Sequence, residues 1–331
     1  MARLIDGYDS ALFDLDGVLY LGPVAVPGAA EAIAGLRELG VRVGFVTNNA
    51  ARSPETVAEH LTDLGILADV SDIVTSAQAG AHMLARALPA GSSVLIVGTQ
   101  ALADEVAKVG LVPVWSSDER PVAVIQGYDP DMTWPRLDDA CYAIQGGAAW
   151  FATNTDANRP TDRGRVPGAG AQIAVVATSV DGEPQVAGKP FRPLLDETVE
   201  RLGARRPIFV GDRIDTDIEG AVAVGMDSLF VFTGTHGKRE LLAARPTGRP
   251  TFIGWGAGAL LHPGRVAVPT GDEVACGRAV VGVKEGRIVI DGPLATREEQ
   301  LDALWALLLL FWNQVDDTDA EDALAALDMV P

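Results

Sequence analysis

The chain has 331 residues, of which 48% are hydrophobic, and its formal net charge is −19. This length and apolar content are enough for two or more domains with real cores, so disorder is not the default expectation. The negative charge argues against nucleic acid as a partner, because a phosphate backbone needs basic surfaces, and against an anionic membrane surface. A small phosphorylated metabolite stays possible, since it needs only a local cation.

Two further features bear on location. The longest apolar stretch, from Ala303 to Trp312, is too short to span a bilayer. The chain has two cysteines, Cys141 and Cys276, and the first ten residues show no signal-peptide pattern. A reducing compartment is the simplest setting for such a chain, so we expect a cytoplasmic protein.

Residues 1–78 alternate between strand and helix signals. The apolar run Ala11 to Phe13 predicts a strand, and Pro27-Gly28 begins a helix that Gly40 ends. Val41 to Val46 predicts the next strand, and Ser53-Pro54 begins the next helix. This order is typical of a parallel sheet covered by helices.

A second α/β pattern occupies about residues 79–183. It contains apolar strand-like runs and one stretch with helical spacing: Val94–Val97, Val122–Ile125, Leu137–Ile144 and Trp150–Thr153. The first pattern resumes over residues 184–262, with a helix through Leu195 and strands at Ile208–Val210 and Leu229–Phe232. We therefore interpret residues 79–183 as a cap inserted into the core domain.

Residues 263–331 differ in character. Val280–Val283 and Arg287–Ile290 flank a short turn and predict a hairpin. The stretch from about Arg297 to Val315 predicts a helix that is apolar nearly all round, and such a helix must be buried against the core or in a homodimer interface. The predicted fold class is α/β: a parallel-sheet core, an inserted α/β cap and a small α+β C-terminal region.

Four short motifs follow one another along the chain: Asp14-Leu15-Asp16-Gly17, Thr47-Asn48-Asn49, Gly188-Lys189-Pro190, and Gly211-Asp212 with Thr216-Asp217 close behind. Three of the four come directly after a predicted strand. Ligands of open α/β sheets bind at the carboxyl ends of the strands, so we expect these side chains to converge on one crevice.

Each motif alone is weak evidence, because Asp-x-Asp-Gly is commonly a turn and Gly-Lys-Pro a loop. Together they supply the groups that metal-assisted phosphoryl transfer needs. Asp14 and Asp16 repel each other, so a cation is expected between them, and Mg²⁺ prefers oxygen ligands. One carboxylate can act as a nucleophile that forms an aspartyl phosphate, and the other as a general acid and base. Lys189 would neutralise charge on the transferred oxygens.

The motifs resemble those of the haloacid dehalogenase (HAD) superfamily of phosphatases, in its NagD-like branch. The resemblance covers about Ile5 to Trp255 and rests on five phrases: Phe13–Val18, Val46–Ser53, Val166–Gly170, Ala187–Pro190 and Gly211–Ile218. It implies a HAD-like Rossmannoid core and Mg²⁺-dependent hydrolysis of small phosphate monoesters. The branch includes phosphatases of glycerol 3-phosphate, phosphoglycolate, pyridoxal phosphate and 4-nitrophenyl phosphate. The core match and the appended tail most resemble the glycerol 3-phosphate phosphatases.

By this resemblance, Asp14 is the nucleophile and a metal ligand. Asp16 is the general acid and base, and gives its backbone carbonyl to the metal. The remaining roles follow in the same way: Thr47, Asn48 and Lys189 hold the phosphate, Asp212 ligates Mg²⁺, and Asp217 supports that metal site.

The cap offers two further candidates. In relatives a cap loop closes over the organic part of the substrate, and Gln126–Pro130 is the candidate here, with Tyr128 as the contacting residue; a plain strand-to-helix turn is the alternative. Asn154–Pro160 is expected at the cap–core junction, where Arg159 meets a substrate anion or forms a surface salt bridge. A phosphotransferase and a non-catalytic scaffold that regulates a partner stay open as other functions.

Overall fold

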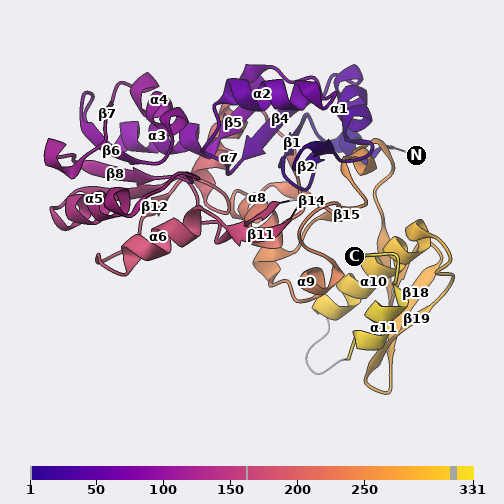
Figure 1. Cartoon of the computed structure of the whole chain (residues 1–331). Helices are drawn as coiled ribbons and strands as arrows, with labels where there is room; N and C mark the ends of the chain where they lie inside the picture. Colours follow the sequence, from indigo (N-terminus) through magenta and orange to yellow (C-terminus); the bar gives the residue numbers. More distant parts are fainter. Residues whose placement is uncertain (1, 162, 314–318) are drawn as a thin grey trace.

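A six-stranded, fully parallel sheet forms the core of the computed structural model, which describes residues 2–161, 163–313 and 319–331 (Figure 1). Its strands run in the order β15 (Phe252–Gly254), β14 (Asp227–Val231), β13 (Pro207–Gly211), β1 (Ser10–Phe13), β4 (Arg42–Thr47) and β5 (Ile73–Thr75). The central strand β1 is buried along its whole length, as expected for a parallel strand covered on both faces.

Helices cover both faces of this sheet. They are α1 (Ala29–Glu38) and α2 (Pro54–Asp63) on one face, and α7 (Arg192–Leu202) and α8 (Glu219–Ala223) on the other. Ser53 caps α2 as predicted, because its side chain accepts a hydrogen bond from the backbone N–H of Thr56. The predicted β-α-β-α order of the first 78 residues is confirmed.

The cap is a second parallel sheet with its own helices. The strand order is β12 (Gln185–Val186), β9 (Ala149–Ala152), β8 (Ala123–Gln126), β6 (Ser93–Val97) and β7 (Val112–Val114). Its helices are α3 (Ser76–Ala87) and α4 (Gln100–Lys108) on one face, and α5 (Trp134–Gln145) and α6 (Ala169–Ala177) on the other. Because β12 pairs with β9, the cap sheet extends past residue 183, and we propose the domain boundary after Val186.

Two small hairpins were not predicted. One belongs to the core and follows Gly17: β2 (Tyr20–Leu21) with β3 (Val24–Ala25). The other belongs to the cap: β10 (Asn158–Thr161) with β11 (Gly164–Pro167). Both lie at the junction of core and cap and contribute to the pocket described below.

The appended region combines an antiparallel sheet with two helices. The sheet contains β16 (Ala267–Thr270), β17 (Glu273–Cys276), β18 (Ala279–Lys284) and β19 (Arg287–Asp291), and the helices are α10 (Arg297–Asn313) and α11 (Glu321–Ala326). The predicted hairpin is β18–β19. The predicted end of the long helix near Val315 lies outside the described residues.

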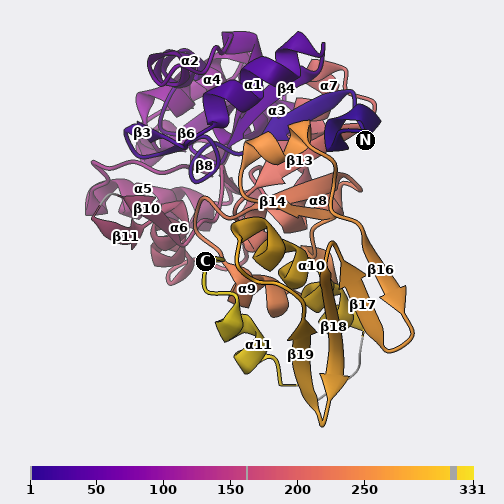
Figure 2. The same cartoon turned by 90° about the vertical axis from the view of Figure 1, so that its right-hand side faces the viewer.

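Burial of the apolar helix is confirmed. One face of α10 packs on Val281 of β18, and another packs on the core through Phe230 and on Leu241 of α9 (Lys238–Leu242). Figure 2 shows α10 between the antiparallel sheet and the core. Leu304, Leu307 and Leu308 are fully buried, so this helix attaches the appended region to the core.

Short turns of 3-10 or π helix complete the described chain: Leu4–Gly7, Val70–Asp72, Ser117–Glu119, Ile214–Ile218, Pro246–Gly248 and Ala257–Leu261. Within residues 2–161, 163–313 and 319–331, no helix is both long and apolar enough to cross a membrane.

Candidate active site

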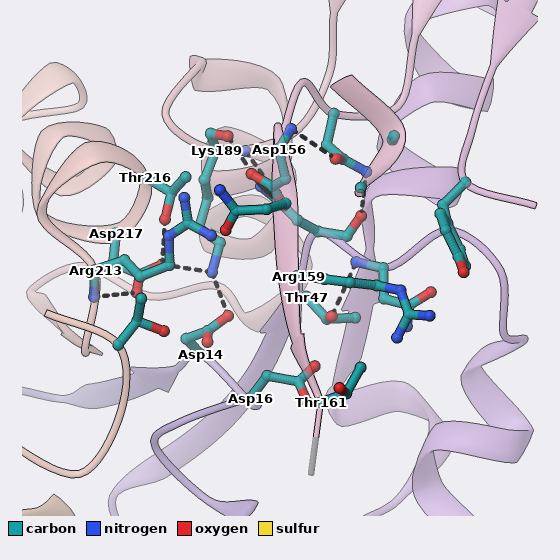
Figure 3. Close-up of a pocket in the computed structure, with 18 of the residues that line it drawn as sticks. Asp14, Asp16, Thr47, Asp156, Arg159, Thr161, Lys189, Arg213, Thr216 and Asp217 are labelled. Carbon is teal, nitrogen blue, oxygen red and sulfur yellow. Dashed lines mark hydrogen bonds and ion pairs between the residues drawn. The ribbon is translucent and has the colours of Figure 1, made fainter. Parts of the chain in front are cut away.

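A cavity of about 440 Å³ lies between core and cap, at the carboxyl ends of β1 and β4. Figure 3 shows the side chains that line it. Of the eight residues assigned a catalytic, phosphate- or substrate-binding or metal role from the sequence, seven are among them: Asp14, Asp16, Thr47, Asn48, Tyr128, Lys189 and Asp217. The eighth, Asp212, lies directly behind, with a carboxylate oxygen within 4.8 Å of oxygens of Asp14 and Asp217. The predicted convergence on one crevice is therefore observed.

Lys189 is the cationic centre of the site. Its Nζ lies 2.5 Å from Asp14 Oδ1 and 2.7 Å from Asp217 Oδ1, and only 1% of its side chain is exposed. In Figure 3 both carboxylates point toward this ammonium group. A buried lysine without such partners would be costly, so the two aspartates account for its charged state.

The pKa values reflect a crowded acidic cluster. Burial raises the pKa of Asp14 well above its usual range; Lys189 opposes this shift, whereas Asp217 and Asp212 add to it. Burial, followed by repulsion from Asp217, raises the pKa of Asp212 to about 7. Burial alone would lower the pKa of Lys189, but attraction from Asp14 and Asp217 outweighs it and raises that pKa.

The same cluster fits a divalent cation. Oxygens of three carboxylates lie within 4.8 Å of one another, and Lys189 pairs with two of the three, Asp14 and Asp217. Oδ1 of Asp212 is buried and has no hydrogen-bond partner among the described residues, as expected for an oxygen reserved for a metal ion. Asp14 and Asp212 therefore suit the role of carboxylate ligands.

Asp217 has a different position in the cluster. Its Oδ1 pairs with Lys189, and its Oδ2 accepts hydrogen bonds from the backbone N–H groups of Asp212 (3.2 Å) and Arg213 (3.1 Å). Both oxygens are thus engaged within the protein. This arrangement favours a supporting role, in which Asp217 orients Lys189 and the backbone that carries Asp212.

Small residues make room for these carboxylates. Gly17 has φ +91°, a conformation that favours glycine, and a Cβ there would lie 2.5 Å from Asp212 Oδ2. A Cβ at Gly211 or Gly234 would also collide with Asp217 or Asp212. The glycines of the Asp-x-Asp-Gly and Gly-Asp motifs are therefore needed for a steric reason: the ends of two strands lie so close together that a side chain at either position would collide with a carboxylate.

Asp16 lines the same pocket as Lys189. Thr161 of the cap hairpin lines it as well (Figure 3). Although the Asp16 side chain faces the open cavity, the surrounding protein limits its hydration and raises its pKa, while Arg52 and His60 lower it. A carboxyl group with a raised pKa is suited to donating a proton.

Asn48 joins core and cap. Its Nδ2 donates to the Lys189 carbonyl (3.0 Å) and lies 3.2 Å from Asp156 Oδ2, and its backbone carbonyl accepts from Asn154 Nδ2 (2.7 Å). The stretch Asn154–Pro160 was predicted at this junction. Asp156 itself was missed, because no local pattern indicates that an aspartate in a loop will pair with an asparagine more than a hundred residues away.

The cap contributes an aromatic side chain, Tyr128, and a guanidinium group, Arg159, to the wall of the pocket. The Arg159 guanidinium lies 4.8 Å from the centre of the Tyr128 ring, in a cation–π contact. No ion pair of Arg159 is found within the described chain, which disfavours the predicted alternative of a surface salt bridge. Several other lining residues were missed by the sequence analysis: Tyr20, Arg52, His60, Asn158, Thr161, Arg213 and Thr235.

A parallel α/β core with an inserted cap, and an acidic site with a buried lysine between the two, define a capped hydrolase with a Rossmann-like core. A family model described as haloacid dehalogenase-like hydrolase matches residues 11–112, and a second, described as HAD-hydrolase-like, matches residues 186–254. The chain belongs to the haloacid dehalogenase-like hydrolases.

The named proteins to which this chain is similar are phosphatases. D-glycerol 3-phosphate phosphatase of Mycobacterium tuberculosis is 46% identical over 254 residues, which are 77% of this chain and 71% of that protein. Acid sugar phosphatase of Staphylococcus saprophyticus is 36% identical over 236 residues, 71% of this chain and 90% of that protein. Glycerol phosphate phosphatase from M. tuberculosis, solved in complex with magnesium, has a TM-score of 0.89 at 39% identity and covers 99% of both chains.

Proposed function

We propose that the protein is a Mg²⁺-dependent phosphatase of small phosphate monoesters, with glycerol 3-phosphate as its preferred substrate. The observation that carries this proposal is the contact of Lys189 Nζ with Asp14 Oδ1 at 2.5 Å, inside a carboxylate cluster that opens on a cavity. A nucleophile, a phosphate-binding cation and a metal site then share one location.

In the first half-reaction, the Asp14 carboxylate attacks the phosphorus atom. A bond forms between an Asp14 oxygen and phosphorus, while the bond from phosphorus to the ester oxygen breaks. Asp16, protonated beforehand, gives its proton to the departing alcohol oxygen, and the pKa of Asp16 is raised in the direction that this role needs. Lys189 and Thr47 hold the oxygens of the transferred group.

In the second half-reaction, Asp16 accepts a proton from a water molecule that attacks the aspartyl phosphate. The bond between Asp14 and phosphorus breaks, which returns Asp14 to its carboxylate form and releases inorganic phosphate. Asp14 and Asp212 would hold the cation, together with the Asp16 backbone carbonyl. When bound, Mg²⁺ offsets the negative charge of the phosphoryl oxygens.

The substrate assignment rests on the pocket wall and on the relatives. Arg52, Asn158, Arg159 and Thr161 supply polar groups to the cavity wall. Such groups suit the hydroxyls of glycerol, and a sugar phosphate would also find partners there. The M. tuberculosis relative is named for glycerol 3-phosphate and its solved counterpart for glycerol phosphate, whereas the S. saprophyticus relative is named acid sugar phosphatase.

Partners and location complete the proposal. We propose a small phosphorylated metabolite as the partner, a cytoplasmic location in keeping with free Cys141 and Cys276, and a homodimer. The apolar helix α10 is buried within its own chain, so it provides no support for the homodimer. Sedimentation velocity at several protein concentrations tests that part of the proposal.

The substrate is tested by comparing kcat/KM across a panel: glycerol 3-phosphate, phosphoglycolate, pyridoxal phosphate, 4-nitrophenyl phosphate and a hexose phosphate. We expect glycerol 3-phosphate to be preferred and all hydrolysis to stop when a chelator removes Mg²⁺. A preference of about tenfold or more for an aromatic or carboxylated ester would contradict the substrate assignment. Full activity in excess chelator would contradict the metal requirement.

A further inference from the structure

The segment Thr233–Gly237, here called the strap, joins β14 to α9 and wraps around Asp212. The backbone N–H of Thr235 donates to Asp212 Oδ2 at 2.6 Å, and the backbone N–H of His236 donates to the Asp212 carbonyl at 3.3 Å. The carboxylate also packs so closely on Gly234 that a Cβ there would collide with it. The direction in which the free Oδ1 of Asp212 points therefore depends on where the strap lies.

The beginning of the strap is attached to the core. Thr233 Oγ1 donates to the carbonyl of Gly17 at 2.6 Å, which links the strap to the loop that carries Asp14 and Asp16. In the middle, Nδ1 of His236 accepts a hydrogen bond from the backbone N–H of Ile214 at 3.0 Å. Both contacts are made within the core domain.

The far end of the strap is attached to the appended region through Lys238, the first residue of α9. Lys238 Nζ donates to the carbonyls of Leu327 (2.5 Å) and Val330 (2.7 Å), and its backbone N–H donates to the carbonyl of Pro331 (2.7 Å). Bonds from an ammonium group to carbonyls are charge-assisted and stronger than neutral ones. Figure 2 shows the end of the chain beside α9.

The acceptors of these bonds are themselves fixed. Leu327 and Val330 are buried in the same apolar cluster as Leu301 and Leu304 of α10. Lysine side chains at a surface normally keep their ammonium groups in water. Lys238 instead directs its ammonium group to carbonyls just beyond α11, so three hydrogen bonds connect a well-packed part of the appended region to the residue that follows the strap.

We propose that Lys238 is a positioning residue, through which residues 327–331 of the appended region hold the strap and thereby orient Asp212 for a divalent cation. The inference rests on the metal role of Asp212 in the proposed function. The appended region would thus affect metal binding, although it contributes no residue to the pocket among those described.

The test is the affinity of the full chain for Mg²⁺, measured by titration calorimetry without substrate, together with the melting temperature in chelator. Lys238→Met removes the ammonium donors and keeps the length of the side chain, whereas Lys238→Arg keeps donors. Arg239→Met is the matched control, because it breaks an exposed ion pair with Glu321 that joins α9 to α11 one residue further on (2.8 Å). Asp212→Asn serves as the reference for loss of the metal ligand.

We expect Lys238→Met to weaken Mg²⁺ binding by about tenfold, Lys238→Arg to stay within about threefold of the unaltered protein, and Arg239→Met to leave the affinity unchanged. At saturating Mg²⁺, the KM for the ester should not change in Lys238→Met. If Lys238→Met does not fold, Lys238→Gln takes its place with the same expectation, because it cannot reach both carbonyls.

Two results would overturn the inference in different ways. Unchanged Mg²⁺ affinity in Lys238→Met, with or without a lower melting temperature, would show that Lys238 only joins two parts of the fold, provided that Asp212→Asn has lost the affinity. Unaltered Mg²⁺ binding in Asp212→Asn would refute the proposed metal role of Asp212, and the positioning role of Lys238 would fail with it.

Discussion

Asn48 and Lys189 are joined by a closed pair of hydrogen bonds: Asn48 Oδ1 accepts from the Lys189 backbone N–H at 2.8 Å, and Asn48 Nδ2 donates to the Lys189 carbonyl at 3.0 Å. The pair links the end of β4 to the segment by which the chain returns from cap to core. It fixes the backbone of the lysine that contacts Asp14.

Asn48→Ala tests the consequence of this pairing. The substitution leaves the buried N–H of Lys189 without its acceptor, which costs about 1–3 kcal/mol, and lets the lysine backbone move. We expect kcat to fall by about tenfold or more and the melting temperature to drop. Gln145→Ala, which removes an exposed bond to the Ser179 carbonyl in the cap, is the control and should leave kcat unchanged. Equal kcat in both variants would mean that Asn48 does not position Lys189.

The pKa of Asp212 predicts how Mg²⁺ binding depends on pH. Burial raises this pKa to about 7, so in the metal-free protein the folded state favours the protonated carboxyl. Protonated Asp212 therefore contributes to the free energy of unfolding of the metal-free protein at low pH, and this contribution is lost as pH rises from about 4 through 7. Mg²⁺ requires the ionised form, so protons compete with the metal below pH 7.

This competition can be followed by melting the protein with and without Mg²⁺. We expect the Mg²⁺-induced rise in melting temperature to be larger at pH 8 than at pH 6, and the apparent affinity at pH 6 to be about tenfold weaker than above pH 7. A rise of the same size at both pH values would show that no carboxyl group with a raised pKa takes part in metal binding.

Arg159 provides a test of substrate recognition by the cap. Its guanidinium group makes a cation–π contact with Tyr128, and Arg159 lines the cavity, where it can contact the organic part of the ester. We expect Arg159→Gln to raise the KM for glycerol 3-phosphate by about tenfold, with a smaller effect on kcat, since single contacts of this kind contribute about 1–3 kcal/mol.

Arg163→Gln is the matched control for Arg159, because Arg163 is exposed in the turn of the same hairpin and does not line the pocket among the described residues. Its KM should equal that of the unaltered protein. If both variants showed the same KM, Arg159 would have no part in binding the substrate.

How far the site could be predicted depends on what holds each residue in place. Asp14 and Asp212 come directly after buried parallel strands and Thr47 is the last residue of another, so the strand signals alone bring them to one edge of the sheet. Lys189 follows no core strand. The motif set predicted that Lys189 neutralises charge on the transferred oxygens, and the family resemblance implied that it holds the phosphate. The position of Lys189 in the fold depends on contacts with Asn48, which no local pattern indicates.

The pocket's outer wall was harder to predict for a physical reason. The strands β2 and β3 have two residues each, and β10 and β11 are polar hairpin strands without an apolar alternation. Such hairpins are stabilised by packing between core and cap, which leaves no local signature. Tyr20 and Thr161 were missed in this way, whereas Tyr128 was predicted from the resemblance to relatives whose cap loop closes over the substrate.

The most direct test of the account is the release of phosphate from glycerol 3-phosphate by Asp14→Asn in saturating Mg²⁺. The amide keeps the shape of the side chain but cannot form the aspartyl phosphate, so we expect turnover to fall by about a thousandfold or more. The substitution also removes one of the two carboxylate partners of buried Lys189, so the melting temperature in chelator is measured to establish that the variant is folded. Hydrolysis by a folded Asp14→Asn protein at a rate close to that of the unaltered protein would contradict catalysis through Asp14.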